Sequence, residues 1–251
     1  MNLSARSHST SNDYTRAVDT HPDRHRAVFS MVVDGQRVWV KRSKKRYGTS
    51  WQKLLHIVTG SYLSPDIKLD HELAVMEQLR ARGALVPEVL HREQDYMVLS
   101  DIGPTLHVLM QQNPPMDEKR SMLHKAATAL RHLHRKDGWH GNPKLLDLTL
   151  HPTGVGFIDF EEATASKLPI EWLQARDLWL FAHSTVRFDA TGQLAADALE
   201  HYGQKIQLRL LKRFAYWSLP LYALLWPLQN ILGRDVRFAL ATTRAILNVH
   251  L

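Results

Sequence analysis

Short apolar runs of strand length occupy much of the first hundred residues. Residues 28–33 and 37–41 are rich in β-branched and aromatic side chains and are separated by Asp34-Gly35. An Asp-Gly pair between two such runs predicts a hairpin, because both central residues of a type I′ turn need positive φ. Residues 87–90 and 96–99 predict two further strands. The pattern therefore indicates a small sheet in the first part of the chain.

Helical periodicity appears between these strands and dominates the rest of the chain. A helix is predicted from Asp70 to Gly83, because apolar residues recur there at intervals of three and the glycine supplies a stop. Another helix is predicted from Asp117 to Gly138, with Asp117 as its cap. The remaining predicted elements are a hairpin of residues 146–150 and 155–158 and helices at residues 169–184, 192–202 and 205–251, the last broken by Pro220 and Pro227.

These elements predict an α+β fold of two lobes. Residues 1–25 lack an apolar run, so a flexible N-terminal tail is expected, since such a segment buries too little apolar surface to offset its ordering entropy. Residues 26–100 are expected to form a small β-rich N-lobe with one helix, and residues 101–251 a larger helical C-lobe. The boundary is placed at the turn-like segment 101–104.

Composition and charge narrow the classes of partner and compartment. The chain has 251 residues and a formal net charge of +7, which favours an anionic partner such as a nucleotide, a glycolipid or an anionic membrane surface. Nucleic-acid binding is a weaker alternative, because it rests on charge alone without interleaved aromatic and basic residues. The absence of cysteine excludes disulfides and thiolate metal sites. With no secretory apolar core in residues 1–25, a cytoplasmic location is expected.

The most informative stretch runs from His140 to Leu150 and is followed by Asp159. It begins His-Gly-Asn, and Asp147 follows Asn142 by five positions, so the spacing is that of H-x-D-x-x-x-x-N with acid and amide exchanged. The chain thus resembles the protein-kinase-like superfamily, and most of all bacterial lipopolysaccharide (Kdo/heptose) kinases and small-molecule phosphotransferases with an H-G-D loop. The resemblance implies a bilobal kinase-like fold and phosphotransfer from ATP, with Mg²⁺, to a lipopolysaccharide or lipid-linked sugar at the cytoplasmic membrane face.

The resemblance also implies a set of nucleotide-binding residues. Lys41 ends Val38-Trp39-Val40-Lys41, which resembles the V-A-I-K strand whose lysine pairs the ATP phosphates. Glu72 stands early on the following helix, where the partner of that lysine is expected. Ser100 and Ile102 fall in a segment that resembles the hinge, whose backbone would meet adenine. One departure is that no G-x-G-x-x-G precedes Lys41.

Two carboxylates are expected to bind the metal ion. Asp147 occupies the position of the metal-binding Asn, and Asp159 resembles the metal-binding Asp of D-F-G, although Glu161 makes this motif D-F-E. Carboxylate oxygens are the hard ligands that Mg²⁺ prefers. Two other residues are assigned structural roles: His140 would hold the loop backbone, and Asp177 would brace it.

The exchange at Asn142 leaves more than one function open. An amide cannot accept a proton at neutral pH, and general-base assistance is typically worth ~10²–10⁴-fold. Phosphoryl transfer depends mainly on positioning and charge neutralisation, so Asn142 could still orient the acceptor while Asp147 binds metal or serves as base. The alternatives are a pseudokinase that acts as a nucleotide-binding or scaffolding module, and a protein Ser/Thr kinase.

Two segments carry surface hypotheses. Residues 41–58 are basic and then amphipathic, so they could contact an anionic membrane or form a solvated loop with a packed helix. Residues 214–233 carry no charge and allow buried helices, interfacial membrane contact or a membrane span; buried helices are the favoured interpretation. A zinc site is not predicted, because no H-E-x-x-H pattern accompanies the histidines.

Overall fold

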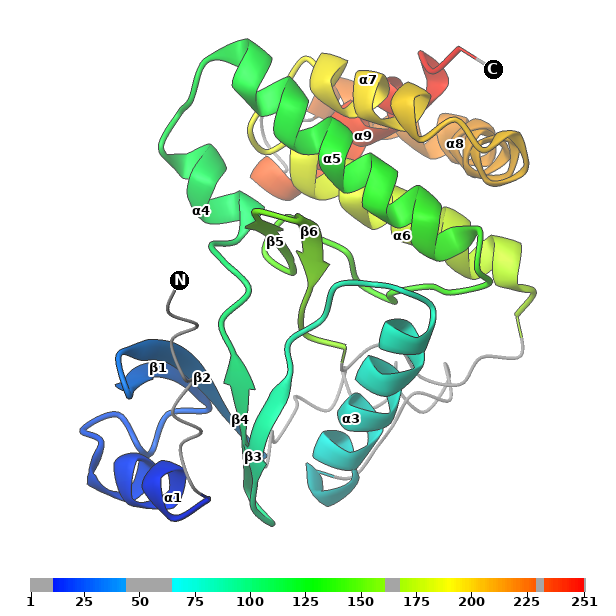
Figure 1. Ribbon diagram of the computed structural model, residues 1–251. Helices are drawn as coiled ribbons and strands as arrows, with labels where there is room; N and C mark the ends of the chain where they lie inside the picture. The colour runs from blue at the N-terminus through cyan, green and yellow to red at the C-terminus, as the bar shows by residue number, and fades with distance from the viewer. Residues whose placement is uncertain (1–10, 44–64, 161–167, 229–232, 251) are drawn as a thin grey trace, which may run out of the picture. The chain divides into compact units, whose positions relative to one another are not determined.

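The computed structural model describes residues 11–43, 65–160, 168–228 and 233–250, and the chain divides into two compact units (Figure 1). The first unit comprises Met1–Ala74 and Pro87–Ile102, and the second comprises Val75–Val86 and Gly103–Leu251. The division after Ile102 lies two residues beyond the predicted lobe boundary. It also gives Val75–Val86 to the second unit, which the sequence did not predict.

A four-stranded antiparallel sheet forms the centre of the first unit. Its order is β1-β2-β4-β3, and its strands are β1 (Val28–Val33), β2 (Gln36–Arg42), β3 (Val89–Arg92) and β4 (Tyr96–Ser100). The predicted hairpin is confirmed: Asp34 and Gly35 have φ of 50° and 76°. Alternate residues of β1 are buried, as a sheet with one covered face requires. The core of this unit consists of Val18, Phe29, Met31, Val33, Val38, Val40, Tyr96 and Val98.

The prediction of a flexible tail over residues 1–25 is wrong for its second half. Ser11–Thr20 forms helix α1, and its Val18 is fully buried against the sheet core. Ser11 and Thr15 place their hydroxyls 3.1 and 3.2 Å from the two ring nitrogens of His91. One buried valine and a pair of hydroxyl contacts therefore anchor a segment whose composition predicts none, because His91 lies about eighty residues away in sequence and the core around Val18 exists only once the sheet has formed.

Helix α3 (Pro65–Ala81) confirms the first predicted helix, although it begins before Asp70. Its end is set by Gly83, which has φ of 79°. The Gly83 amide donates to the Arg80 carbonyl at 2.8 Å, and the Ala84 amide donates to the Leu79 carbonyl at 3.0 Å. These two bonds form a Schellman motif, which explains why a glycine is needed at this position.

The second unit contains helices packed together and one small hairpin (Figure 1). The predicted hairpin and helices are present, whereas the short α4 was not predicted. The prediction that Asp117 caps its helix is wrong, because α5 begins at Met116 and Asp117 lies within its first turn. The elements are α4 (Leu106–Gln111), α5 (Met116–His134), β5 (Leu148–His151), β6 (Gly154–Phe157), α6 (Ile170–Thr185), α7 (Gln193–Tyr202), α8 (Lys205–Leu225), the 3-10 helix η1 (Trp226–Leu228) and α9 (Arg234–Leu247).

The C-terminal helices correct two predictions. Pro220 lies inside α8 instead of ending it. Its missing N–H leaves the Tyr216 carbonyl without its helical partner, but both residues are on the exposed side of α8, where water can satisfy that oxygen. The favoured interpretation of residues 214–233 as buried helices is also wrong for much of α8, because Tyr216, Trp217 and Leu224 are exposed. Among the described helices, none is both long and apolar enough to cross a membrane.

Residues 103 and 104, which begin the Gly103–Leu251 segment of the second unit, lie against the β5–β6 hairpin. The Leu150 amide of β5 donates to the Pro104 carbonyl at 2.9 Å. Gly103 has φ of 98°, and a Cβ placed on it would lie 2.3 Å from the Leu150 carbonyl oxygen. Only glycine therefore fits this approach, which fixes the segment beside the hairpin that leads to Asp159.

Candidate active site

Lys41 and Glu72 form a buried ion pair in the first unit. Lys41 lies in β2 opposite Met97 of β4, and its Nζ donates to Glu72 Oε1 at 2.7 Å. The two side chains are only 12% and 3% exposed. The pairing expected from the sequence is therefore present. Removing two charges from water often costs more free energy than their mutual attraction returns, so a buried ion pair is weak evidence for stabilisation of the fold. A functional role explains this contact better.

In the segment that resembles a kinase hinge, Ser100 already uses its amide and its hydroxyl in hydrogen bonds within the sheet. The Ser100 amide donates to the Glu88 carbonyl at 2.9 Å, and the Ser100 hydroxyl accepts from the Glu88 amide at 2.8 Å. An adenine contact by Ser100 would therefore have to use its carbonyl and not its N–H. Ile102 has a buried side chain, and its predicted backbone contact with adenine stays a prediction.

His140 holds the loop that carries Asn142, as the sequence predicted. Its Nδ1 accepts from the Asn142 amide at 3.2 Å, so Nδ1 carries no proton and the ring hydrogen is on Nε2. That Nε2 donates to the Ile158 carbonyl at 3.2 Å. Complete burial lowers the pKa of His140, with Asp177 acting in the opposite direction. A neutral imidazole with both nitrogens engaged is a structural residue, not a general base.

Asp177 braces the same loop from helix α6. Its Oδ2 accepts from the His140 amide at 2.6 Å, and its Oδ1 accepts from the Gly141 amide at 2.9 Å. Gly141 has φ of 94°, the left-handed conformation that places both amides toward one carboxylate. Asp177 is fully buried, and its Oδ2 also lies 3.3 Å from His134 Nε2. The predicted bracing contact is thus confirmed.

A buried polar network surrounds Asp177 and was not predicted from the sequence. His134 of α5 lies with its Nδ1 2.8 Å from the Tyr202 hydroxyl, and burial raises the pKa of Tyr202. Gln174 donates to the carbonyls of His134 and Gly138 at 2.9 and 3.1 Å. The spacing of two residues could have indicated this network. Gln174 and Asp177 lie three positions apart on the buried face of an apolar helix, where each polar side chain needs a hydrogen-bond partner.

The β5–β6 hairpin brings Asp147 and Asp159 to the same end. Asp147 immediately precedes β5, and the Ile158 amide donates to the Asp147 carbonyl at 3.0 Å, so Asp159 is the next residue along. Asp147 is 8% exposed, whereas Asp159 is exposed and has φ of 64°. A non-glycine residue in this conformation is uncommon and clusters at functional sites, although aspartate tolerates it better than most.

This donor set fits Mg²⁺ in chemical type. Asp147 and Asp159 supply hard carboxylate oxygens, and Mg²⁺ commonly takes one or two protein carboxylates together with phosphate oxygens and water. Asn142 adds an amide oxygen on the same loop. Within the described ranges, no group of three or more His, Cys, Asp or Glu side chains could hold a metal ion. Glu161 lies outside the described residues, as does the amphipathic part of residues 41–58.

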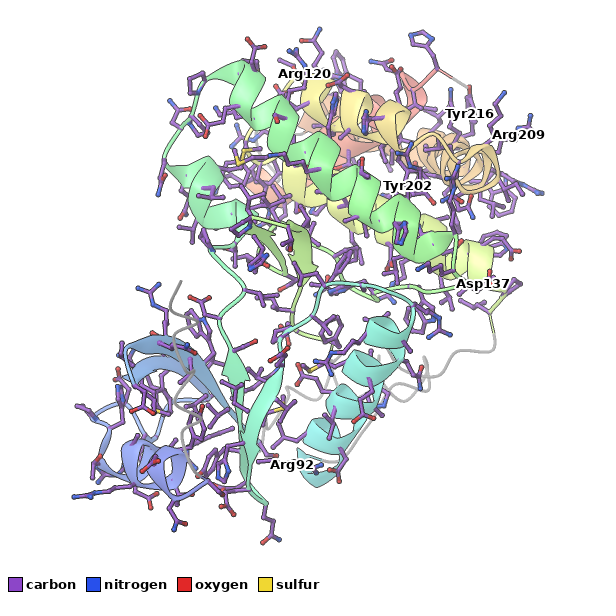
Figure 2. The ribbon with its side chains drawn as sticks, viewed as in Figure 1. Arg92, Arg120, Asp137, Tyr202, Arg209 and Tyr216 are labelled. Atoms are coloured by element: carbon purple, nitrogen blue, oxygen red, sulfur yellow. The ribbon has the colours of Figure 1, made fainter. Side chains whose placement is uncertain are left out.

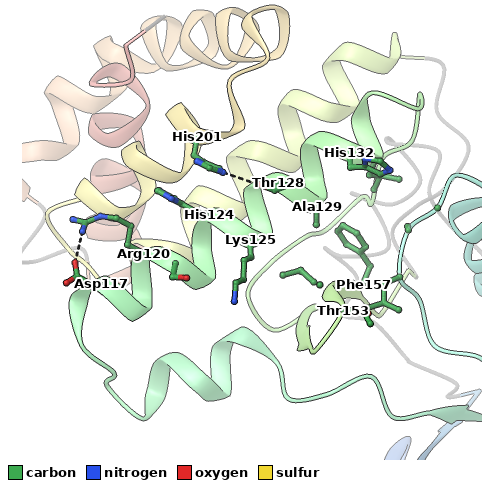
Figure 3. Close-up of a pocket in the computed structure, with 17 residues that line it drawn as sticks. Asp117, Arg120, His124, Lys125, Thr128, Ala129, His132, Thr153, Phe157 and His201 are labelled. Atoms are coloured by element: carbon green, nitrogen blue, oxygen red, sulfur yellow. Dashed lines mark hydrogen bonds and ion pairs between the residues drawn. The ribbon is translucent and has the colours of Figure 1, made fainter.

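A separate cavity of about 730 Å³ lies in the second unit and contains none of the predicted site residues (Figure 3). Its walls come from α5, the turn of the β5–β6 hairpin, the segment after α3, and His201 of α7. Among the lining residues, Thr128 Oγ1 lies 3.0 Å from His201 Nε2, and the His201 ring stacks on that of His124 with centroids 4.2 Å apart. This cavity is thus not the predicted nucleotide site.

Comparisons with known proteins bear on the fold. No family model matches the chain. An uncharacterized protein of Haemophilus influenzae is 26% identical over 235 residues, which are 89% of this chain and 92% of that protein. The solved structure of WaaP in complex with acyl carrier protein is similar with a TM-score of 0.50 and 19% identity, covering 83% of this chain and 89% of that one.

The structural likeness confirms the fold that the sequence motifs predict. At 19% identity it speaks for the fold alone, and that fold is the one implied by the resemblance to lipopolysaccharide-kinase-like proteins. The small antiparallel sheet of the first unit and the helices of the second agree with it. The chain has a mixed α and β, protein-kinase-like fold.

Proposed function

We propose that this protein is an ATP- and Mg²⁺-dependent phosphotransferase that transfers the γ-phosphate to an alcohol group of a lipopolysaccharide or lipid-linked sugar. The observation that carries the proposal is the Lys41–Glu72 ion pair, 2.7 Å long and almost fully buried. A kinase requires this pair to position the phosphates, whereas a buried ion pair contributes little to stability. Retaining it is therefore best explained by nucleotide binding.

Each site residue has a role in this proposal. Lys41, oriented by Glu72, pairs the phosphates, and the backbone of Ser100 and Ile102 contacts adenine. Asp147 and Asp159 hold Mg²⁺, which neutralises charge on the phosphates when bound. Asn142 orients the acceptor hydroxyl through its amide, and the contacts of its loop to His140 and Asp177 limit its motion.

The acceptor class rests on fold and charge. The fold is shared with WaaP, and the net charge of +7 favours an acceptor or surface with negative charge. Both features support an anionic glycolipid as the acceptor, and the proposal places its phosphorylation at the cytoplasmic membrane face.

Thermal unfolding with ATP, with and without Mg²⁺, tests nucleotide binding. At an ATP concentration a hundredfold above Kd, binding adds about 2.7 kcal/mol to the free energy of unfolding, which raises Tm by about 5–10 °C for a chain of this size. We expect Mg²⁺ to enhance this shift in the wild type and in the exposed control Asp117→Ala, and not in Asp147→Ala. Absent or metal-independent stabilisation by ATP would contradict the assignment.

A pseudokinase is the second candidate, favoured by one observation: Asn142 stands where kinases carry the acid. This candidate predicts nucleotide binding without phosphate transfer. Turnover by the wild-type protein, lost in Asp159→Ala, would exclude it. An inactive wild type whose Asn142→Asp variant is also inactive would support it.

A further inference from the structure

Helix α8 presents an apolar and aromatic face away from the core of its unit. Its exposed residues recur at intervals of three, four and seven, which places them on one side of a helix. Ile206, Tyr216, Trp217 and Leu224 are 61%, 55%, 64% and 66% exposed. We call this the α8 outer face, and it consists of Ile206, Arg209, Arg213, Tyr216, Trp217 and Leu224. Figure 2 shows Arg209 and Tyr216 at the outer edge of α8.

The opposite side of α8 explains why the outer face stays exposed. Gln207, Leu208, Leu211 and Ala215 are buried, and α8 packs through them on neighbouring helices of the second unit. The helix therefore already has a core side. A group of large apolar side chains on the solvent-facing side of a helix is unusual for a protein surface. Exposed apolar patches of this kind mark interaction sites.

The charges of α8 are all of one sign. Its sequence contains Lys205, Arg209, Lys212 and Arg213 and no acidic residue. Lys212 is directed to the C-terminal segment, where its Nζ donates to the Val249 carbonyl at 2.7 Å. Arg213 lies over the ring of Trp217, 5.0 Å from its centroid, so cation and aromatic ring are presented together. The outer face thus combines apolar area with positive charge.

We propose that the α8 outer face docks on an anionic phospholipid bilayer, with α8 lying in the plane of the interface. Trp and Tyr are enriched at the level of lipid headgroups, and an amphipathic helix with a basic rim binds anionic membranes in this orientation. A second copy of this chain fits less well, because a symmetric contact through this face would bring the arginines of both copies together. The inference needs no nucleotide, so it stands apart from the proposed phosphotransfer.

Sedimentation with vesicles tests the proposal. Vesicles of phosphatidylcholine with phosphatidylglycerol should bind the full-length protein more tightly than vesicles of phosphatidylcholine alone, and added salt should weaken binding. Each basic residue near an anionic surface is worth about fivefold in the partition constant, so Arg209→Ala with Arg213→Ala should weaken binding about 25-fold. Trp217→Ala with Leu224→Ala should also weaken binding. The matched control is Val32→Ala, since Val32 is 67% exposed in β1.

Fluorescence provides a second readout in a variant that changes little in size. Vesicles with brominated lipid should quench tryptophan emission of the wild type, and Trp217→Phe should lose part of that quenching. Vesicle binding by both α8 variants at wild-type strength would overturn the proposal, as would no binding by folded wild-type protein. A dimer in light scattering that Trp217→Glu abolishes, without loss of vesicle binding, would assign the face to a second copy instead.

Discussion

At the scale of single residues, the buried Asp177 braces the loop that carries Asn142. It accepts from two backbone amides and lies beside His134. In Asp177→Asn the amide group would face one of those N–H donors and leave it without an acceptor. We expect the free energy of unfolding to fall by about 3 kcal/mol, since bonds to a charged group contribute about 1.5–3 kcal/mol each. Urea denaturation measures this loss.

The control for Asp177 is Asp137→Asn. Asp137 is exposed and has φ of 52°, a conformation that asparagine also tolerates. Its substitution should change the free energy of unfolding by less than about 0.5 kcal/mol. Equal effects of the two substitutions would refute the bracing role of Asp177.

His140 gives stability a defined pH dependence. Burial lowers its pKa in the folded state, so the folded protein keeps it neutral when the unfolded chain becomes protonated. The unfolded state then binds more protons, and stability falls as pH drops below the unfolded pKa of about 6.5. The loss is up to about 1.4 kcal/mol per pH unit.

Denaturation between about pH 7.5 and about pH 5, the range in which histidines titrate, should reveal this slope. Because burial also lowers the pKa of His183 and His201, the informative quantity is the difference between wild type and His140→Gln. The wild-type slope should be the steeper one. Parallel curves for the two proteins would show that His140 does not contribute.

At the scale of elements, α1 should stabilise the sheet of the first unit. Val18 is fully buried among Phe29, Val40 and their neighbours. Val18→Ala removes two buried methyl groups and should cost about 1–3 kcal/mol. Arg16→Ala, on the exposed side of the same helix, should cost little. Denaturation of the two variants separates packing by α1 from helix propensity, and equal stabilities would mean that α1 does not hold the sheet.

The elements that could be predicted from the sequence are those whose boundaries are determined by residues within or next to them. The β1–β2 hairpin follows from Asp34-Gly35, and the end of α3 follows from Gly83, because each turn needs positive φ within a few residues. Helix α1 depends on His91, which is distant in sequence, and on a core that three strands form together, and Pro220 is tolerated within α8 because its surroundings are exposed. Neither condition can be read from a local pattern.

The residues of the candidate site also divide into those that a local motif predicts and those whose roles depend on distant contacts. Lys41, Glu72 and Asp177 could be assigned from motif positions, and their contacts are present. Gln174 and Tyr202 could not, because their roles depend on helices that meet only in the folded unit. The backbone of Ser100 was expected to contact adenine, and the sequence did not show that its amide donates to Glu88 within the sheet.

At the scale of the whole molecule, the proposed roles are divided between the two units. Lys41 and Glu72 belong to the first unit, and Asn142, Asp147 and Asp159 belong to the second. The α8 outer face is also in the second unit but outside the proposed site. Nucleotide binding, metal dependence and membrane binding can therefore be tested by separate substitutions.

The most direct test of the account is phosphate transfer from γ-labelled ATP to a lipopolysaccharide extract with Mg²⁺. We predict transfer by the wild type and by Asp117→Ala, and a loss of about 10²–10³-fold or more in Asp159→Ala, the range expected when a group that stabilises transition-state charge is removed. Asp159→Ala that transfers phosphate at the wild-type rate, or a folded wild type that transfers none, would contradict the account.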